Sequence, residues 1–137
     1  MIYLLDTNIL IDLIKQRPPE VAERIDQLPG TAQLAMSFIT WADLLQGAVG
    51  SSRRDAVERQ LDHLARQVEV LYPEDSQICR HYAEQATALR RAGTPIGAND
   101  LWIACHALAV DATLVTHNLR EFTRISGLSV VDWVQQP

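Results

Sequence analysis

The chain has 137 residues, 47% of them hydrophobic, with 17 Asp and Glu against 12 Lys and Arg and a formal net charge of −5. This length predicts a single domain, residues 1–137, with a core that needs neither disulfides nor a structural metal. The acidic balance argues against broad electrostatic adhesion to nucleic acid, for which a basic domain is expected. Cys79 and Cys105 both fall in helical patterns, which predicts buried packing in a reducing, cytoplasmic compartment.

The sequence pattern predicts neither a signal peptide nor a membrane-spanning segment. The N-terminal apolar run reaches Asp6 with no basic stretch before it, unlike a signal peptide. The longest apolar stretch, 101–110, is interrupted by His106 and is half of the roughly 20 residues that a bilayer requires. We therefore expect no export by that route and no contact with a membrane.

Strand and helix patterns alternate along the chain. Residues 2–5 form a short apolar run that ends in turn formers, as in a strand buried on both faces. Helical spacing predicts helices at 9–14, 20–28, 41–45 (ended by Gly47 and Gly50), 52–67, 74–93 and 99–108, and β-rich runs predict strands at 34–36, 68–72, 113–116 and 130–131. The alternation predicts an α/β fold, a three-layer α/β/α sandwich around a mostly parallel sheet of four to five strands.

Polar residues gather where the predicted strands end. Ligands of open parallel sheets bind beyond the carboxyl ends of the strands, and this rule selects Asp6, Asp43, Asp100, Asn118 and Glu121. Carboxylates that converge repel one another without a cation, and oxygen ligands suit Mg²⁺. The histidines, at 63, 81, 106 and 117, lack the short spacing of a zinc site. The pattern favours metal-assisted phosphodiester hydrolysis.

Each of these residues also has a purely structural interpretation. Asp6 could begin an Asx turn, Asp43 could complete a capping box with Thr40, and Asp100 could complement a helix dipole. The two polar residues after the fourth strand are ordinary near a helix start. Together they still favour one site, because the structural interpretations do not require all of them at one edge of the sheet.

Four spaced segments carry a family resemblance: LLDTN at 4–8, SFIT at 37–40 followed by an acidic residue, GTPIGAND at 93–100, and LVTHNLREF at 114–122. In this order they resemble the PIN-domain family, and specifically VapC-type toxins of bacterial toxin–antitoxin pairs. The resemblance spans nearly the whole chain, including a closing segment at 127–133. It implies a Mg²⁺- or Mn²⁺-dependent endoribonuclease that cuts structured RNA such as transfer RNA, forms a homodimer and is silenced by a VapB-type antitoxin.

The resemblance also assigns residues. Asp6 and Asp100 match the first and third carboxylates of the family's metal site. Asp43 stands where the family usually has Glu, and the lost methylene shortens the side chain by about 1.5 Å. Asn118 matches the fourth catalytic position. Support for these side chains is expected from Thr7, Asn8, Thr116 and Glu121. Arg90, Arg91 and Arg120 are the expected RNA contacts, because they lie near the predicted edge of the sheet.

Two other function classes are open. The Asp at position 43 is compatible with a catalytically weak or inactive PIN-like module that binds RNA or protein, and metal-dependent cleavage discriminates the two. A phosphoacceptor receiver domain shares the layered architecture but needs a lysine after the last strand. The only lysine is Lys15, which disfavours that class.

Overall fold

The computed structural model describes residues 1–134, so the expected domain end at residue 137 lies outside the described residues. One sheet holds all the strands that it describes: β1 (Ile2–Leu5), β2 (Gln33–Ser37), β3 (Glu69–Leu71), β4 (Thr113–Val115) and β5 (Ser129–Val131). The helices are α1 (Thr7–Lys15), α2 (Pro19–Gln27), α3 (Phe38–Val49), α4 (Arg54–Gln67), α5 (Gln77–Arg91), α6 (Ala98–Ala109) and α7 (Leu119–Phe122). Every strand pairs in parallel, which confirms the predicted α/β architecture.

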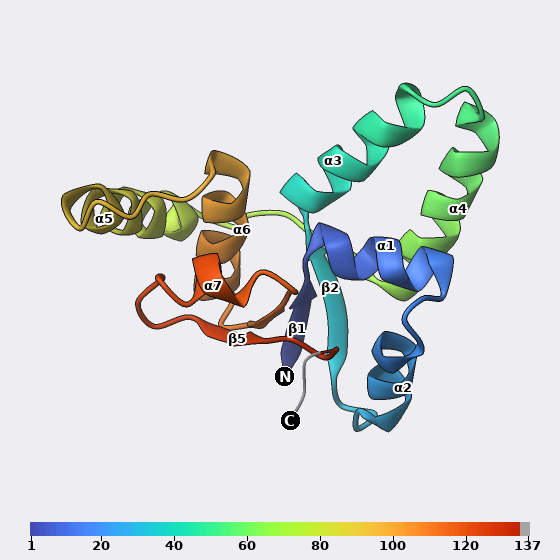
Figure 1. Cartoon of the computed structure of the whole chain (residues 1–137), viewed down its shortest axis with the longest axis horizontal. Helices are drawn as coiled ribbons and strands as arrows, with labels where there is room; N and C mark the ends of the chain where they lie inside the picture. Colours follow the sequence, from blue (N-terminus) through green and yellow to red (C-terminus); the bar gives the residue numbers. More distant parts are fainter. Residues whose placement is uncertain (135–137) are drawn as a thin grey trace.

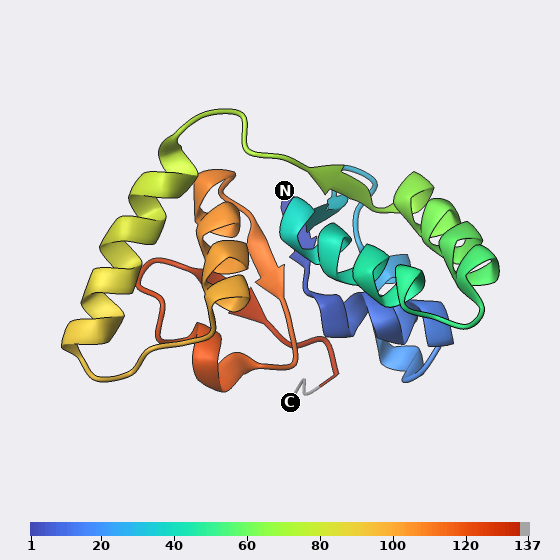
Figure 2. The ribbon, with the colours of Figure 1, turned by 90° about the horizontal axis from the view of Figure 1, so that it is seen from above.

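The helices form two layers on opposite faces of the sheet. Figure 2 shows α5 and α6 on one side, and α1, α3 and α4 on the other. Two core clusters match these layers, one that joins the sheet to α5, α6 and α7, and one that joins it to α1 through α4. Figure 1 shows α3 and α4 as a helical hairpin that extends away from the sheet.

Successive residues of each central strand enter different clusters. Leu4 packs with the α5–α6 cluster, whereas Leu5 packs with the α1–α4 cluster, and both are fully buried. The pairs 35–36 and 114–115 divide in the same way. Because side chains alternate across a strand, a continuous apolar run is what a sheet covered on both faces requires.

The strand order, β3-β2-β1-β4-β5, places a topological switch point between β1 and β4. From β1 the chain builds outward through β2 and β3, and after α6 it returns to the other side of β1 as β4. A crevice opens at such a point beyond the carboxyl ends of the strands. The segments that leave β1 and β4, residues 6–8 and 116–118, therefore face each other there.

Several local predictions were wrong. Gly47 lies inside α3 and does not end it. It is exposed on the helix, and a Cβ there would meet no atom within 4 Å, so no packing contact requires the helix to stop. Cys79 is exposed on α5, so its predicted burial was wrong, whereas Cys105 is buried and burial raises the pKa of its thiol to about 12. Among the described residues, no helix has both the length and the apolar character needed to cross a membrane.

Candidate active site

Asp6 lies at the switch point, directly after β1, as the N-cap of α1. Its Oδ1 accepts a hydrogen bond from the Thr7 backbone N–H at 2.8 Å, and its Oδ2 accepts one from Thr116 Oγ1 at 2.8 Å and a longer one from Asn8 Nδ2 at 3.4 Å. The side chain is buried, with 4% exposure. Burial raises the pKa of Asp6 above its ordinary value, and the hydrogen bonds only partly offset this. Asp6 is thus both a helix cap and a desolvated carboxylate.

Asp100 lies in the first turn of α6 and faces the same edge. Its pKa is raised to about 6, first by burial and then by the negative charges of Asp6 and Glu121, a hydrogen bond with Glu121 and the charge of Asp43. These causes place four acidic side chains near one another, although they come from four separate segments. Such mutual repulsion is what a bound cation would relieve.

Asp43 reaches this cluster from α3. Its Oδ1 accepts a hydrogen bond from Asn99 Nδ2 at 3.3 Å, which joins α3 to the start of α6. The capping-box interpretation was wrong, because the N-cap of α3 is Ser37, whose Oγ accepts from the Ile39 N–H at 3.2 Å. Thr40 lies inside the helix, and within residues 1–134 its buried hydroxyl has no hydrogen-bond partner.

The residues after β4 form the other wall. The backbone N–H of Asn118 donates to Thr116 Oγ1 at 3.1 Å, and its side-chain amide donates to Glu121 Oε2 at 3.0 Å. Thr116 therefore links Asp6 to the turn that carries Asn118. The structure brings together Asp6, Asp43, Asp100, Asn118 and Glu121, together with Thr7, Asn8 and Thr116 as their supports.

The donor set suits a hard divalent cation held partly through water. Carboxylate oxygens are the ligands that Mg²⁺ and Mn²⁺ take, and Mg²⁺ usually keeps several waters and binds one or two carboxylates. In the part of the chain that the structure describes, no three His, Cys, Asp or Glu side chains are arranged to hold an ion. A cation at the acidic cluster would therefore need water among its ligands.

Sequence reasoning missed four residues at this edge. Asn99 holds Asp43, and the His117 ring lies between the carboxylates of Asp12 and Asp132. The histidines had been considered only for zinc spacing, which cannot reveal a contact with residues that are 105 and 15 positions away.

Arg90 and Arg91, at the end of α5, and Arg120, on α7, are exposed, as residues that contact a ligand would be.

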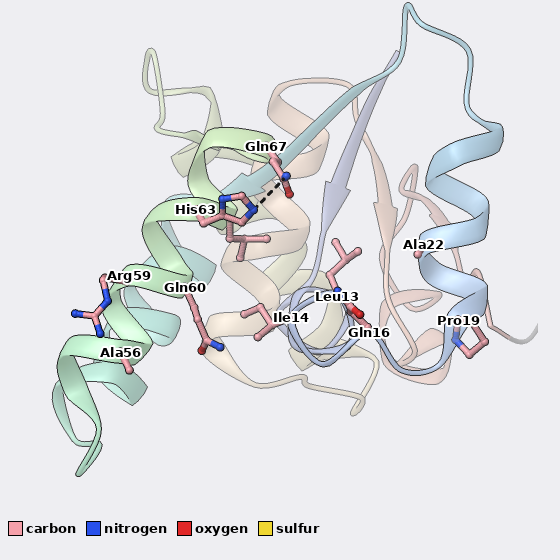
Figure 3. Close-up of a pocket in the computed structure, with 11 residues that line it drawn as sticks. Leu13, Ile14, Gln16, Pro19, Ala22, Ala56, Arg59, Gln60, His63 and Gln67 are labelled. Atoms are coloured by element: carbon pink, nitrogen blue, oxygen red, sulfur yellow. Dashed lines mark hydrogen bonds between the residues drawn. The ribbon is translucent and has the colours of Figure 1, made fainter.

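A separate groove lies between α1, α2 and α4 (Figure 3). Its volume is about 820 Å³, and it is lined by apolar side chains, Leu13, Ile14 and Leu64 among them. Polar groups from α4 border it, where His63 Nε2 and Gln67 Nε2 lie 3.4 Å apart. None of the acidic site residues lines this groove, so the molecule carries two distinct surface features.

The site and fold agree with comparisons to known proteins. The PIN domain family model matches residues 3–128. "Ribonuclease VapC1" of Haemophilus influenzae strain R2866 is 52% identical over 98% of this chain and 100% of its own length, and "tRNA(fMet)-specific endonuclease VapC" of Salmonella typhimurium is 36% identical over 96% and 97%. A solved structure of VapBC-1 from nontypeable Haemophilus influenzae superposes with a TM-score of 0.93 at 52% identity, covering 98% of this chain and 100% of that chain. VapBC2 from Rickettsia felis, bound to a promoter DNA fragment, gives 0.90 at 35% identity, covering 97% and 99%.

The chain therefore belongs to the PIN domain family. These relatives match it over nearly its whole length. Within the family, it is a member of the VapC-type ribonuclease toxins, as the spaced sequence motifs predicted.

Proposed function

We propose that this protein is a metal-dependent endoribonuclease toxin that hydrolyses RNA phosphodiester bonds. The observation that carries the proposal is the convergence of Asp6, Asp43, Asp100 and Glu121 at the switch point, with the pKa of Asp6 and of Asp100 raised. Keeping such groups together is unfavourable for folding, so it favours a function that uses their charge. The VapC-type relatives named as ribonucleases support RNA as the substrate.

Mg²⁺, or Mn²⁺ in its place, would be held by Asp6, Asp43 and Asp100, directly or through water. When bound, the ion supplies Lewis-acid polarisation of a phosphoryl oxygen and a more acidic water. One of the three carboxylates orients and deprotonates the attacking water. Asn118, fixed by Thr116 and Glu121, closes the opposite side of the site.

The Asp6→Asn variant tests this proposal. We expect it to lose at least about 100-fold in Mg²⁺-dependent RNA cleavage, because the amide removes a negative charge but keeps the shape and the acceptor oxygen of the helix cap. Cleavage of a transfer RNA pool, with and without EDTA, measures the effect, and circular dichroism checks the fold. Wild-type protein that binds RNA without cutting it at any Mg²⁺ or Mn²⁺ concentration would instead establish the inactive-module alternative.

Structured RNA such as transfer RNA is the substrate class that we favour. A VapC relative named as a tRNA(fMet)-specific endonuclease supports this choice. Exposed Arg90, Arg91 and Arg120 would contact RNA phosphates, and each phosphate contact adds to the salt dependence of binding. Local cations and a metal-bound site are compatible with an overall charge of −5.

A VapB-type antitoxin is the proposed inhibitor. Solved VapBC complexes of chains with this fold support the partner. We place an apolar antitoxin segment in the groove between α1, α2 and α4, which has a volume of about 820 Å³. Leu13, Ile14 and Leu64 offer apolar surface there. A Lys or Arg of the antitoxin would occupy the acidic site. The homodimer remains a proposal, which light scattering of the free toxin measures.

Ala22→Arg tests the groove. Ala22 is exposed on α2 and lines the groove, so a long charged side chain there should block the antitoxin without disturbing the core. We expect antitoxin affinity to fall at least about tenfold, or about 1.4 kcal/mol, while RNA cleavage is unchanged. Ala83→Arg, exposed on α5 in the other helical layer, is the matched control. Equal affinity of the two variants would exclude the groove as the docking surface.

A further inference from the structure

The His117 imidazole lies between two carboxylates. Its Nδ1 is 3.0 Å from Asp132 Oδ1, and its Nε2 is 2.5 Å from Asp12 Oδ2. Asp132 has a fully buried side chain, and the side chains of Asp12 and His117 are 20% and 30% exposed. Ionised carboxylates only accept hydrogen bonds, so both ring nitrogens donate. This contact set favours a doubly protonated ring.

The electrostatics agree with this geometry. Burial alone would lower the pKa of His117, but hydrogen bonds to Asp12 and Asp132 and the charges of both carboxylates outweigh burial, and the net effect is a raised pKa. The pair of contacts therefore behaves as a charge-assisted bridge.

The bridge joins three segments that are distant in sequence. Asp12 belongs to α1, His117 follows β4, and Asp132 follows β5, where its Oδ1 also accepts from the Val134 N–H at 2.9 Å. The His117 backbone N–H donates to Asn8 Oδ1 at 3.4 Å, a second link to the start of α1. The turn after β4 is thus held on two sides.

The residues on either side of His117 are the ones that contact the site. Thr116 donates to Asp6 at 2.8 Å, and the backbone of Asn118 is hydrogen-bonded to Thr116 at 3.1 Å. A small rotation of this turn would move both contacts together. Misplacement by about 1 Å is enough to slow a reaction about 100-fold.

On the basis of the proposed ribonuclease function, we propose that His117 is a positioning residue: clamped between Asp12 and Asp132, it fixes Thr116 and Asn118 against Asp6 for the reaction. His117 does not touch the reacting atoms. It acts through the turn that carries it, and α1 and the segment after β5 are the supports against which the turn is held.

Four variants test this inference in the full chain: His117→Ala, Asp12→Ala, the double variant with both alanines, and Asp12→Asn. We expect both alanine variants to lose about tenfold to hundredfold in kcat for an RNA oligonucleotide with little change in KM. The double alanine variant should lose no more than His117→Ala alone, because that change already removes the contact with Asp12. Asp12→Asn keeps an acceptor oxygen for Nε2–H and should restore most of kcat.

Asp62→Ala, exposed on α4, is the matched Asp-to-Ala control. Folded alanine variants with wild-type kcat, or additive losses in the double variant, would overturn the inference. If the alanine variants unfold, nitrogen NMR of wild-type His117 decides: two bonded ring N–H groups at pH 7 support the bridge, and a ring with a single N–H excludes it. Wild-type protein that fails to cleave RNA would instead count against the proposed function, because the inference concerns only the rate of an active enzyme.

Discussion

The Asp43 side chain is held at the acidic site by the amide of Asn99, 3.3 Å away. Because Asp is one methylene shorter than the family's usual Glu, its carboxylate stays closer to the α3 backbone by about 1.5 Å. This distance favours a contact with metal through water. In the proposed metal site, position 43 would therefore set how tightly the ion is bound, while Asp6 and Asp100 would define where it is bound.

Asp43→Glu should strengthen metal binding. The longer side chain replaces a water-mediated contact with a direct one, so we expect the Mg²⁺ concentration for half-maximal cleavage to fall by up to about tenfold, or about 1.4 kcal/mol. Mg²⁺ titration of cleavage measures this. Asp43→Asn, which removes the charge without lengthening the side chain, should raise that concentration, and a Glu variant that behaves like the Asn variant would contradict the explanation.

The residue types at the site were largely predictable, and their supports were not. Asp6 follows from the rule that strand ends carry ligands, and Asp100 was selected because it begins a helix; both signals depend only on local order. Asp12 and Asp132 escaped it, because their role arises from His117, 105 and 15 residues away. Spacing along the chain reports neighbours on one helix or strand, whereas this bridge exists only once the sheet order brings α1, β4 and β5 together.

At the scale of elements, hydrophobic periodicity predicted the sheet well because each strand is covered on both faces. The short runs at 2–5 and 113–115 are too apolar for an exposed strand and too short for a helix. Helix ends were less predictable. The predicted start at residue 74 became Gln77, because helix ends depend on capping contacts rather than on period. Of the two glycines predicted to end the helix after the second strand, Gly47 lies inside α3 and Gly50 is its C-cap.

Gly93 ends α5 and begins the loop that leads to Asp100. Its φ is +72°, and the Thr94 N–H donates to Leu89 O at 3.0 Å while the Gly93 N–H donates to Arg90 O at 3.1 Å, the pattern of a Schellman cap. Gly93→Ala should lower the free energy of unfolding by about 1 kcal/mol, since an L-residue is strained in this region. Urea denaturation measures the loss. No clash opposes Ala, because a Cβ would meet no atom within 4 Å. Gly93→Asn should lose less stability than Gly93→Ala, because Asn tolerates this φ. Equal losses would implicate a cause other than backbone strain.

At the scale of the whole molecule, the charge of −5 has two parts. Most charged side chains are exposed, where water and salt screen them. The acidic site concentrates a few carboxylates in a poorly solvated edge, where the charges of Asp6, Asp43 and Glu121 raise the pKa of Asp100. The net charge therefore says little about RNA, because the proposed divalent cation at this edge would offset part of its negative charge and attract a phosphate.

This division predicts how the stability of the metal-free protein depends on pH. Asp100 has a folded-state pKa of about 6 against an ordinary value of 3.8, so the folded state binds its proton more tightly than the unfolded state. The free energy of unfolding therefore falls as pH rises from about 4 to about 6, and the loss persists above pH 6.

Asp100→Asn removes this effect, so at pH 7 it should be more stable than wild type by about 1–2 kcal/mol, and the two should converge below pH 4. The pKa values of Asp6 and His117 are also raised, so both groups add a loss with rising pH in both proteins, and the difference between the unfolding curves reports Asp100 together with its interaction with Asp6. Thermal and urea unfolding in EDTA at pH 4, 5, 6 and 7 measure that difference, with the exposed Asp26→Asn as control. Adding Mg²⁺ at pH 7 should then stabilise wild type more than Asp100→Asn, since only wild type retains the full set of carboxylates; a constant difference across this pH range, unaltered by Mg²⁺, would show that Asp100 is not held in a repulsive acidic cluster.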